Sequence, residues 1–440
     1  MKRVSFLTLG CKVNQYDTDA MRGLFIRAGY EVVGTHEAAD VCVINTCSVT
    51  HVGERKSRQA IRKMRRLNPD TIIAVTGCYA QLDPDAIAGI EGVRVIVGTQ
   101  DRHRIVDFVE SCCDDGSVQN HVREILPTTD FENLNLYGGA VEHTRAYVKI
   151  QEGCGNFCTF CIIPYTRGRL KSRRGEDIYA ETLRLTDQGY KEIILTGIHL
   201  GNYGQDLGQG HTLADVVKML LKTTDIRRIR LGSIESVELS DELIALLADE
   251  PRLCPHLHLP IQSGSERVLR MMRRHYHLSD YLALIDDLRQ RVPNIALTTD
   301  LIVGFPGETE EMFQETLATL ESVGFADVHV FPYSRRQGTP AAEFPNQVSE
   351  AEKKERVHRA LETVRNAAAS YRQSFIGTDV DVLVESRLKN GRFEGMSAHY
   401  HRVQLLNEVP ATGEIYSVHV VDEDQNGLIG VAQVKEEESI

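Results

Sequence analysis

Three cysteines with the spacing C-x3-C-x2-C, Cys154, Cys158 and Cys161, constrain this sequence more than any other feature. Thiolates are the ligands of iron-sulfur clusters, and three of them can hold three irons of a 4Fe-4S cluster while the fourth iron stays open. Zinc is the alternative, but a closed zinc site needs a fourth ligand, and the next histidine or cysteine in the chain is His199. The motif therefore predicts a cluster with an open iron.

The first ~115 residues alternate between short apolar runs and segments with helical period. The apolar runs are rich in branched residues and lie at residues 4–9, 41–45, 72–76 and 93–97. Because strands that alternate with helices form parallel sheets, this pattern predicts an open parallel α/β domain.

Three of these predicted strands end in a cysteine: Cys11, Cys47 and Cys78. The carboxyl ends of parallel strands lie at one edge of a sheet, so thiols that are far apart in sequence can converge there. We therefore expect a second three-cysteine site. The alternative is that these thiols only pack at strand ends, as we expect for Cys42 inside its strand.

Residues 147 to 332 repeat a strand followed by a helix. We expect six such strands, at residues 147–150, 192–196, 229–231, 256–259, 296–303 and 327–331. Right-handed crossovers then predict a partial version of the eight-stranded barrel, with the active site in loops at the carboxyl ends of the strands. Polar and glycine residues in those loops are Thr196, Gly197, Glu235, Gln262 and Ser263.

A charged helical stretch at residues 349–374 precedes short alternating runs that are separated by glycines, from Val380 to Val434. This pattern predicts a small antiparallel β-barrel. Such barrels often bind RNA, and a purely structural cap is the alternative.

The chain has 440 residues, 42% of them hydrophobic, which is enough for two or three domains with their own cores. We expect neither a signal segment nor a membrane span, because no apolar stretch approaches the ~18 residues that a span needs. Ten cysteines are too few for a disulfide scaffold in a chain of this length. We therefore expect a cytoplasmic protein.

The formal net charge of -12 disfavours a nucleic-acid partner, because lysine and arginine drive phosphate binding. Two local basic runs point the other way. Seven basic residues lie between Arg55 and Arg66, and five lie between Arg167 and Arg174, directly after the cysteine triad. A solvated helix face is the alternative for the first run, whereas the second could hold a polyanionic substrate.

The cysteine triad resembles the signature of radical S-adenosylmethionine enzymes, and nearly the whole chain resembles the methylthiotransferase family of that superfamily. The resemblance implies a methylthiotransferase domain (1–115), a linker (116–140), a radical domain (141–374) and a TRAM domain that grips the substrate (375–440). It also implies two 4Fe-4S clusters, an auxiliary one and a radical one, held respectively by Cys11, Cys47, Cys78 and by Cys154, Cys158, Cys161.

Two short segments resemble one branch of that family, which modifies N6-threonylcarbamoyladenosine in tRNA. They are TLGCKVNQY at residues 8–16 and NTCSVT at residues 45–50. The sister branch that acts on prenylated adenosine tends to have Gln-Met after the first cysteine, and the ribosomal-protein branch tends to have Pro-Lys. This chain has neither pair.

The resemblance implies methylthiolation of the adenine C2 of that nucleoside, next to the anticodon. Each turnover would use two molecules of S-adenosylmethionine, one for the methyl group and one for the radical that opens an unactivated C-H bond. The auxiliary cluster would supply the sulfur. The implied partners are the tRNA, an electron donor and a sulfur donor.

The superfamily pattern also implies contacts with S-adenosylmethionine. Phe160, Ile302 and Val303 would contact adenine, Thr196 and Gly197 would meet the methionine amine, and Glu235, Gln262 and Ser263 would meet ribose or carboxylate. The basic residues Arg167, Arg169, Arg173 and Arg174 could contact tRNA phosphate or the threonylcarbamoyl carboxylate, arginine being suited to bidentate contacts. Ordinary ion pairing is their alternative role.

Other functions stay open on the sequence alone. The chain could methylthiolate isopentenyladenosine in tRNA or a ribosomal-protein side chain, or it could be a radical enzyme of another reaction type. A non-catalytic iron-sulfur protein that binds RNA or senses redox state would need the clusters but not the nucleotide contacts.

Overall fold

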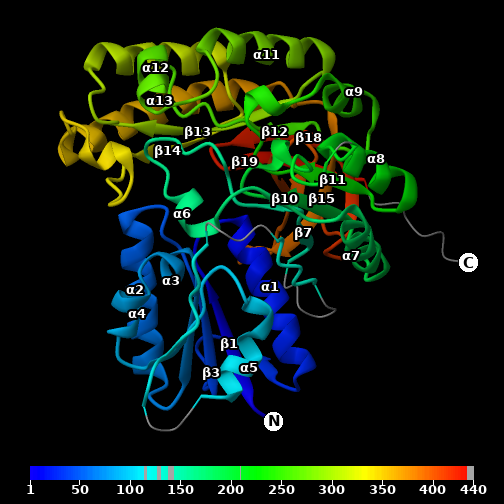
Figure 1. Cartoon of the computed structure of the whole chain (residues 1–440). Coiled ribbons are helices and arrows are strands. Elements are labelled where there is room, and N and C mark those ends of the chain that lie inside the picture. Colours follow the sequence, from blue (N-terminus) through cyan, green and yellow to red (C-terminus); the bar gives the residue numbers. More distant parts are fainter. Residues whose placement is uncertain (113–115, 126–129, 137–142, 209, 434–440) are drawn as a thin grey trace, which may run out of the picture.

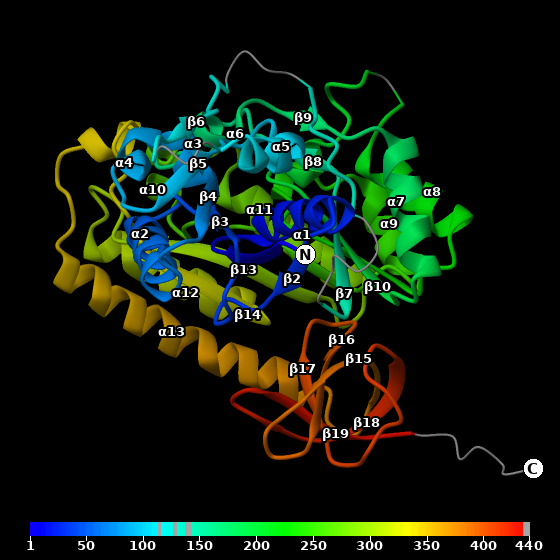
Figure 2. The ribbon, with the colours of Figure 1, turned by 90° about the horizontal axis from the view of Figure 1, so that it is seen from below.

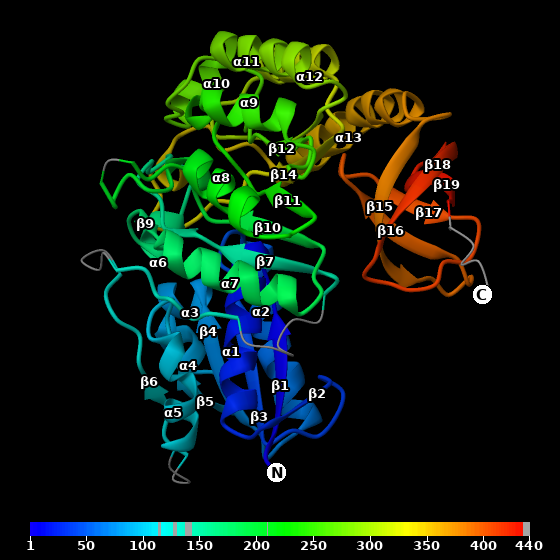
Figure 3. The same cartoon turned by 90° about the vertical axis from the view of Figure 1, so that its right-hand side faces the viewer.

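The computed structural model describes residues 1–112, 116–125, 130–136, 143–208 and 210–433 (Figure 1). Three bodies follow one another along the chain: an amino-terminal sheet with helices, a central curved sheet with helices, and a carboxyl-terminal barrel (Figure 3). Among the described residues, no helix combines the length and the apolar character that crossing a membrane requires.

The amino-terminal body is a six-stranded parallel sheet with the order β2-β1-β3-β4-β5-β6. Its strands are β1 (Arg3–Thr8), β2 (Glu31–Val33), β3 (Val41–Thr46), β4 (Ile72–Gly77), β5 (Val93–Ile96) and β6 (Gln119–Asn120). Its helices are α1 (Lys12–Arg27), α2 (His51–Leu67), α3 (Cys78–Leu82), α4 (Pro84–Ala88) and α5 (Ile105–Glu110). The expected open parallel α/β domain is therefore confirmed.

Both faces of this sheet are buried. In β3, Val41 and Val43 pack into a core with Phe25 of α1, whereas Cys42 and Ile44 pack into a separate core on the opposite face. Alternate residues of a strand point to opposite faces, so a strand covered on both sides reads as a continuous apolar run. The short edge strands β2 and β6 lack such a run. Sequence analysis missed both, and β6 lies inside the segment expected to be linker.

The central body carries six strands in the expected places, ordered β7-β10-β11 and β12-β13-β14. They are β7 (Arg145–Lys149), β10 (Glu192–Thr196), β11 (Arg228–Leu231), β12 (His256–His258), β13 (Ala296–Val303) and β14 (Asp327–Pro332). A parallel bridge between Ser233 and His258 joins the two groups. The partial barrel is therefore confirmed.

Helices lie between the strands of this body and cover its outer side (Figure 1). They are α7 (Gly175–Asp187), α8 (Leu213–Thr223), α9 (Asp241–Asp249), α10 (Glu266–Met271), α11 (Leu278–Arg291) and α12 (Glu310–Val323). A two-stranded ribbon, β8 (Gln151–Glu152) and β9 (Lys171–Ser172), encloses the cysteine triad and α6 (Ile163–Arg167).

The long helix α13 (Glu350–Gln373) runs beside the central body and leads into the closed barrel (Figure 2). The barrel strands are β15 (Asp379–Arg387), β16 (Phe393–Ser397), β17 (Arg402–Leu405), β18 (Ile415–Asp424) and β19 (Gly427–Ala432). The barrel is not wholly antiparallel, because β17 pairs with β19 in parallel to close it. Val434, the expected end of the last strand, lies outside the described residues. The expected domain boundaries stay predictions.

Arginines of β11 hold the barrel against the central sheet. Arg230 is fully buried, pairs with Glu192 at 2.8 Å, and donates hydrogen bonds to the carbonyls of Ser397 and Ala398, each at 3.0 Å. Arg228 donates to the carbonyl of Met396. Because these carbonyls lie at the end of β16 and at the first residue after it, this end of the barrel is the docked one.

Arg230→Leu should release this docking, since it removes both hydrogen bonds to this end of the barrel and leaves the Glu192 carboxylate buried with fewer partners. We expect limited proteolysis within residues 374–378, between α13 and β15, to become faster by about fivefold or more. Proteases cut this connection when the barrel opens locally, and an opening that costs a few kcal/mol becomes more frequent when the docking contacts are lost. Arg402→Leu is the control, because Arg402 is exposed and pairs with Glu394, which belongs to the barrel itself. Equal cleavage rates in the two variants would contradict the docking role.

Candidate cluster and cofactor site

The three amino-terminal cysteines lie at the carboxyl ends of neighbouring strands. Cys11 follows β1 and precedes α1, Cys47 directly follows β3, and Cys78 directly follows β4 as the first residue of α3. The sheet places β1, β3 and β4 side by side. A Cβ at Gly10 would lie 3.3 Å from the Cys47 sulfur, so the turn that carries Cys11 passes directly against Cys47.

The second triad lies in the loop between β8 and α6, where two N-H groups approach its sulfurs. The Asn156 amide donates to the Cys154 sulfur at 3.4 Å, and Arg274 donates to the Cys158 sulfur at 3.5 Å. In the first triad, Arg167 donates to the Cys78 sulfur at 3.2 Å. Such donors stabilise the anionic form of a thiol, so the donor set fits the thiolate ligands of an iron-sulfur cluster.

Without a metal, four of these thiols are held in their protonated form by burial. Burial raises the pKa of both Cys47 and Cys161 to about 12, and it also raises the pKa of Cys11 and of Cys158. Cluster binding must therefore release protons, as is general for cysteine ligands.

His199 approaches the triad although it lies far from it in sequence. Its Nδ1 is 3.6 Å from the Cys154 sulfur, and its Nε2 pairs with Glu238. Burial lowers the pKa of His199, but the bonds to Cys154 and Glu238 outweigh burial and raise that pKa to about 10. Glu238 thus orients the ring through Nε2, and Nδ1 faces the Cys154 sulfur as a hydrogen-bond partner.

One cavity of about 420 Å³ joins the two triads. Cys11 lines it from the amino-terminal body, and Cys161 lines it from the central body. The cavity wall also includes four residues that sequence analysis assigned to S-adenosylmethionine, namely Phe160, Glu235, Gln262 and Ile302. Because one space touches both motifs, a bound molecule there would lie between them.

The other four residues with that assignment do not line the cavity. Val303 is fully buried in the main core, because neighbours in a strand point to opposite faces and Ile302 takes the cavity side. Ser263 is also fully buried, and its hydroxyl contacts Thr316 at 3.3 Å and accepts the Ser265 amide. Neither side chain lines the cavity, and the contacts with S-adenosylmethionine expected for Val303 and Ser263 stay predictions.

Thr196 and Gly197 lie at the end of β10, beside the cavity residue Ile198. The Thr196 carbonyl accepts the Ile150 amide at 3.0 Å, and a Cβ at Gly197 would lie 2.8 Å from the Gln151 side chain. Close packing against Gln151 therefore explains the glycine, and the backbone role expected for this pair stays a prediction.

A buried ion network joins the two bodies behind the first triad. Asp17 of α1 pairs with Lys149 of β7 at 2.6 Å, with Arg167 of α6 at 2.8 Å, and with Arg102. Glu152 of β8 pairs with the same three cations. Burial by itself would raise the pKa of both carboxyls, but these cations outweigh it and hold the pKa of Asp17 below, and that of Glu152 well below, the ordinary value.

This network corrects the assignment of the basic run after the triad. Arg167 is fully buried within it, and Arg173 is 1% exposed and pairs with Glu181 at 3.0 Å. Neither guanidinium can reach a tRNA phosphate. Their arrangement is ion pairing, the alternative that the sequence left open, whereas Arg169 and Arg174 are exposed.

Comparison with known proteins places this site in a family. Residues 3–98 match a family described as "Uncharacterized protein family UPF0004", and residues 148–320 match the radical SAM superfamily. The Bacillus subtilis protein "Threonylcarbamoyladenosine tRNA methylthiotransferase MtaB" is 42% identical over 96% of this chain and 94% of its own length. The chain belongs to the radical S-adenosylmethionine methylthiotransferase family.

A relative of another name is also similar. The "tRNA-2-methylthio-N(6)-dimethylallyladenosine synthase" of Acetivibrio thermocellus is 36% identical over 94% of this methylthiotransferase and 87% of its own length. A solved structure of the radical S-adenosylmethionine methyltransferase TsrM from Kitasatospora setae has a TM-score of 0.57 at 16% identity, covering 78% of this chain and 77% of that one. That likeness supports the fold alone. Membership of the superfamily implies a 4Fe-4S cluster and S-adenosylmethionine as cofactors.

Asp17→Asn should strongly destabilise the methylthiotransferase, because it leaves three buried cations with one anion fewer. Breaking a buried pair costs on the order of 3–5 kcal/mol, and we expect a clear fall in the urea midpoint. Glu242→Gln is the matched control, since Glu242 pairs with Lys218 at the surface; a surface substitution of this kind changes stability by about 0.5 kcal/mol or less. If the two variants unfold at the same midpoint, the network does not hold the bodies together.

Proposed function

We propose that this methylthiotransferase adds a methylthio group to C2 of N6-threonylcarbamoyladenosine in tRNA, next to the anticodon. The observation that carries the proposal is the 42% identity, over almost the full length of both chains, to a relative whose name states that activity. The relative named for the dimethylallyl nucleoside is 36% identical. Methylthiolation of the prenylated nucleoside is therefore the second candidate.

We infer that Cys154, Cys158 and Cys161 hold the radical cluster and that Cys11, Cys47 and Cys78 hold the auxiliary one. An open-iron cluster with S-adenosylmethionine supplies a carbon radical strong enough to open an aromatic C-H bond. The residues of this chain have to hold that chemistry in place. The shared cavity supports the proposal, because sulfur delivery and radical formation must meet at one carbon and Cys11 and Cys161 line one space.

The cavity walls divide into apolar and polar parts. Phe160 and Ile302 offer apolar surface suited to a purine, and both pack on the cluster of Phe305 and Tyr333. On the polar side, the Glu235 carboxylate is held by Arg274, which also donates to Cys158. We infer that Glu235 and Gln262 orient the polar groups of S-adenosylmethionine, with Arg274 fixing the position of Glu235.

Helix α2 presents a basic surface for RNA, although the net charge of the chain is -12. Helix α2 begins just after Thr50, which lines the cavity, and it turns Ser57, Ile61 and Met64 inward. Five basic residues on its outer side make no ion pair within the described part of the chain: Arg55, Lys56, Arg62, Lys63 and Arg66. We propose that this face contacts tRNA phosphates, with the carboxyl-terminal barrel as a further RNA contact.

The decisive test is anaerobic reconstitution followed by incubation with reductant, S-adenosylmethionine and tRNA, with the nucleosides read by mass spectrometry. We expect a methylthio mass gain on threonylcarbamoyladenosine and none on isopentenyladenosine. A gain on the prenylated nucleoside alone would support the second candidate. Cleavage of S-adenosylmethionine without gain on either would contradict both substrates, and no cleavage at all would favour a non-catalytic iron-sulfur protein.

Cysteine variants separate the proposed roles of the two clusters. Cys158→Ala should abolish S-adenosylmethionine cleavage, because the radical cluster loses a ligand. Cys47→Ala should lower the iron content by one cluster and keep cleavage, but lose methylthiolation. Cys42→Ala is the control, because that cysteine is buried inside β3 away from the strand ends. Methylthiolation by the Cys47→Ala protein would refute the role of the auxiliary cluster.

A further inference from the structure

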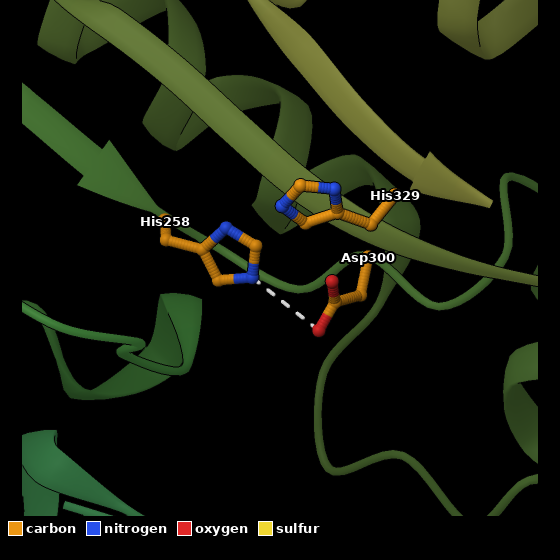
Figure 4. A group of neighbouring side chains, drawn as sticks. All are labelled: His258, Asp300 and His329. Carbon is orange, nitrogen blue, oxygen red and sulfur yellow. Dashed lines mark ion pairs between the residues drawn. The ribbon is translucent and has the colours of Figure 1, made fainter. Parts of the chain in front are cut away.

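Three polar side chains lie close together on one face of the central sheet. They are His258 of β12, Asp300 of β13 and His329 of β14, and Figure 4 shows them turned toward one another. One nitrogen or oxygen from each lies within 4.8 Å of the others. Asp300 also lines the cavity, and so does Phe331, which points to the same face as His329 two residues before it. The cluster is therefore a polar end of the cavity wall.

Two members of the cluster satisfy each other. His258 places Nδ1 2.9 Å from the Thr298 hydroxyl and Nε2 3.3 Å from the Asp300 carboxylate. His329 is exposed, and its ring makes no hydrogen bond or ion pair within the described residues. His258 thus contacts the Asp300 carboxylate, while His329 keeps its hydrogen-bonding capacity for another molecule.

A lysine without an acidic partner stands beside the same face. Lys12 follows Cys11, which lines the cavity, and across the described residues its ammonium group forms no ion pair. It lies 5.7 Å from the centre of the Tyr400 ring, which in turn stacks on His256 with ring centres 4.3 Å apart. His256 precedes His258 by two residues in β12, so the two imidazoles point to one face. Lys12 therefore borders the polar face where the three bodies of the chain meet.

We propose that this face binds the amino-acid substituent of the modified adenosine, with Lys12 pairing with its carboxylate and His329 and Asp300 bonding its other polar groups. The inference rests on the proposed function. A threonylcarbamoyl group carries a carboxylate, a hydroxyl and ureido N-H groups, so it offers a partner for a cation, for an imidazole and for a carboxylate. Lys12, which follows the cavity residue Cys11 and forms no ion pair within the described residues, is the cation that we assign to the anionic end of this substituent.

The same face disfavours a prenyl group. A hydrocarbon chain there would offer no partner to the ammonium of Lys12 or to the ring of His329. Polar groups that a bound ligand covers without pairing them weaken its binding. Sites built to bond a polar substituent reject the analogue that lacks it much more strongly than apolar pockets reject an added group.

A metal ion is the competing occupant, since two imidazoles and one carboxylate are a common set for first-row metals. The cluster does not need a metal to hold it together, because His258 and Asp300 already contact each other at 3.3 Å. Metal occupancy is therefore one outcome of the test.

The test uses the reconstituted full chain and anticodon stem-loop RNAs with two substituents: threonylcarbamoyl, and its carboxamide, in which a neutral amide replaces the carboxylate. For the unmodified protein we expect kcat/KM to fall about tenfold or more on the carboxamide RNA, the order expected for losing a charge-assisted contact. Lys12→Met should show a similar fall on the carboxylate RNA and little further loss on the carboxamide. Lys12→Arg should keep most of the preference.

Lys222→Met is the control for removal of a lysine, because Lys222 is exposed at the end of α8, and it should keep the full preference. All variants are compared at equal iron content, since Lys12 adjoins Cys11. A protein that does not modify threonylcarbamoyl RNA at all would overturn the proposed function. Equal rates on the two RNAs, or an undiminished preference in Lys12→Met, would overturn only this inference. A stoichiometric metal other than iron that is lost in His329→Ala would overturn it in favour of a metal centre.

Discussion

The charges buried between α1 and the central sheet decide where the two cysteine motifs lie relative to one another. Asp17 and Glu152 each contact Lys149, Arg102 and Arg167, and all five side chains are almost completely removed from water. Charges at this depth are tolerable only with their partners in place, so a sliding or rotation of one body would expose unpaired ions to a low dielectric. Arg167 also donates to Cys78, which links the same network to the first cysteine triad.

A second set of contacts closes the other side of the cavity. Arg336, in the loop after β14, pairs with Glu54 of α2, and the His51 amide donates to the Ser334 hydroxyl at 3.1 Å. These contacts adjoin the cavity. Ser334 lines it, and so does Thr50, which directly precedes His51. The cavity is thus built from two bodies that are fixed at both sides, which suits the proposed reaction, in which the sulfur source and the radical source would lie on different domains. A loosely tethered arrangement would not hold reacting atoms within the short distances that such a transfer needs.

The residue pattern was sufficient for the fold wherever burial on both faces demands nearly continuous apolar strands, as in β3 and β4, whose expected positions agree closely with the structure. The convergence of Cys11, Cys47 and Cys78 was predictable for the same reason, because parallel strands carry their ends to one edge. The edge strands β2 and β6 were not predictable, since three and two residues of mixed character carry no period. The parallel closure of the barrel by β17 and β19 depends on a register that local sequence does not encode.

The sequence predicted some of the cavity-lining residues but could not tell them from neighbours that are buried. Four of the expected residues line the cavity: Phe160, Glu235, Gln262 and Ile302. By contrast, Val303 faces the core, and the Ser263 hydroxyl contacts Thr316. Burial and side-chain partners are tertiary properties, so a loop position after a strand could not distinguish these cases. The contact of His199 with Cys154 had no sequence signal, because 45 residues separate them.

The net charge of this enzyme is a poor guide to whether its surface can bind RNA. A net charge of -12 is a sum over the whole chain. Arg167 and Arg173 are nevertheless buried in ion pairs, whereas five basic residues of α2, Arg55, Lys56, Arg62, Lys63 and Arg66, are exposed and form no ion pair within the described residues. The electrostatic field that an RNA meets depends on this distribution, and it is strongest within about 8–10 Å of the exposed cations at physiological ionic strength. An acidic protein can therefore present a basic strip beside its cavity, and the acidic remainder of its surface discourages RNA from settling elsewhere.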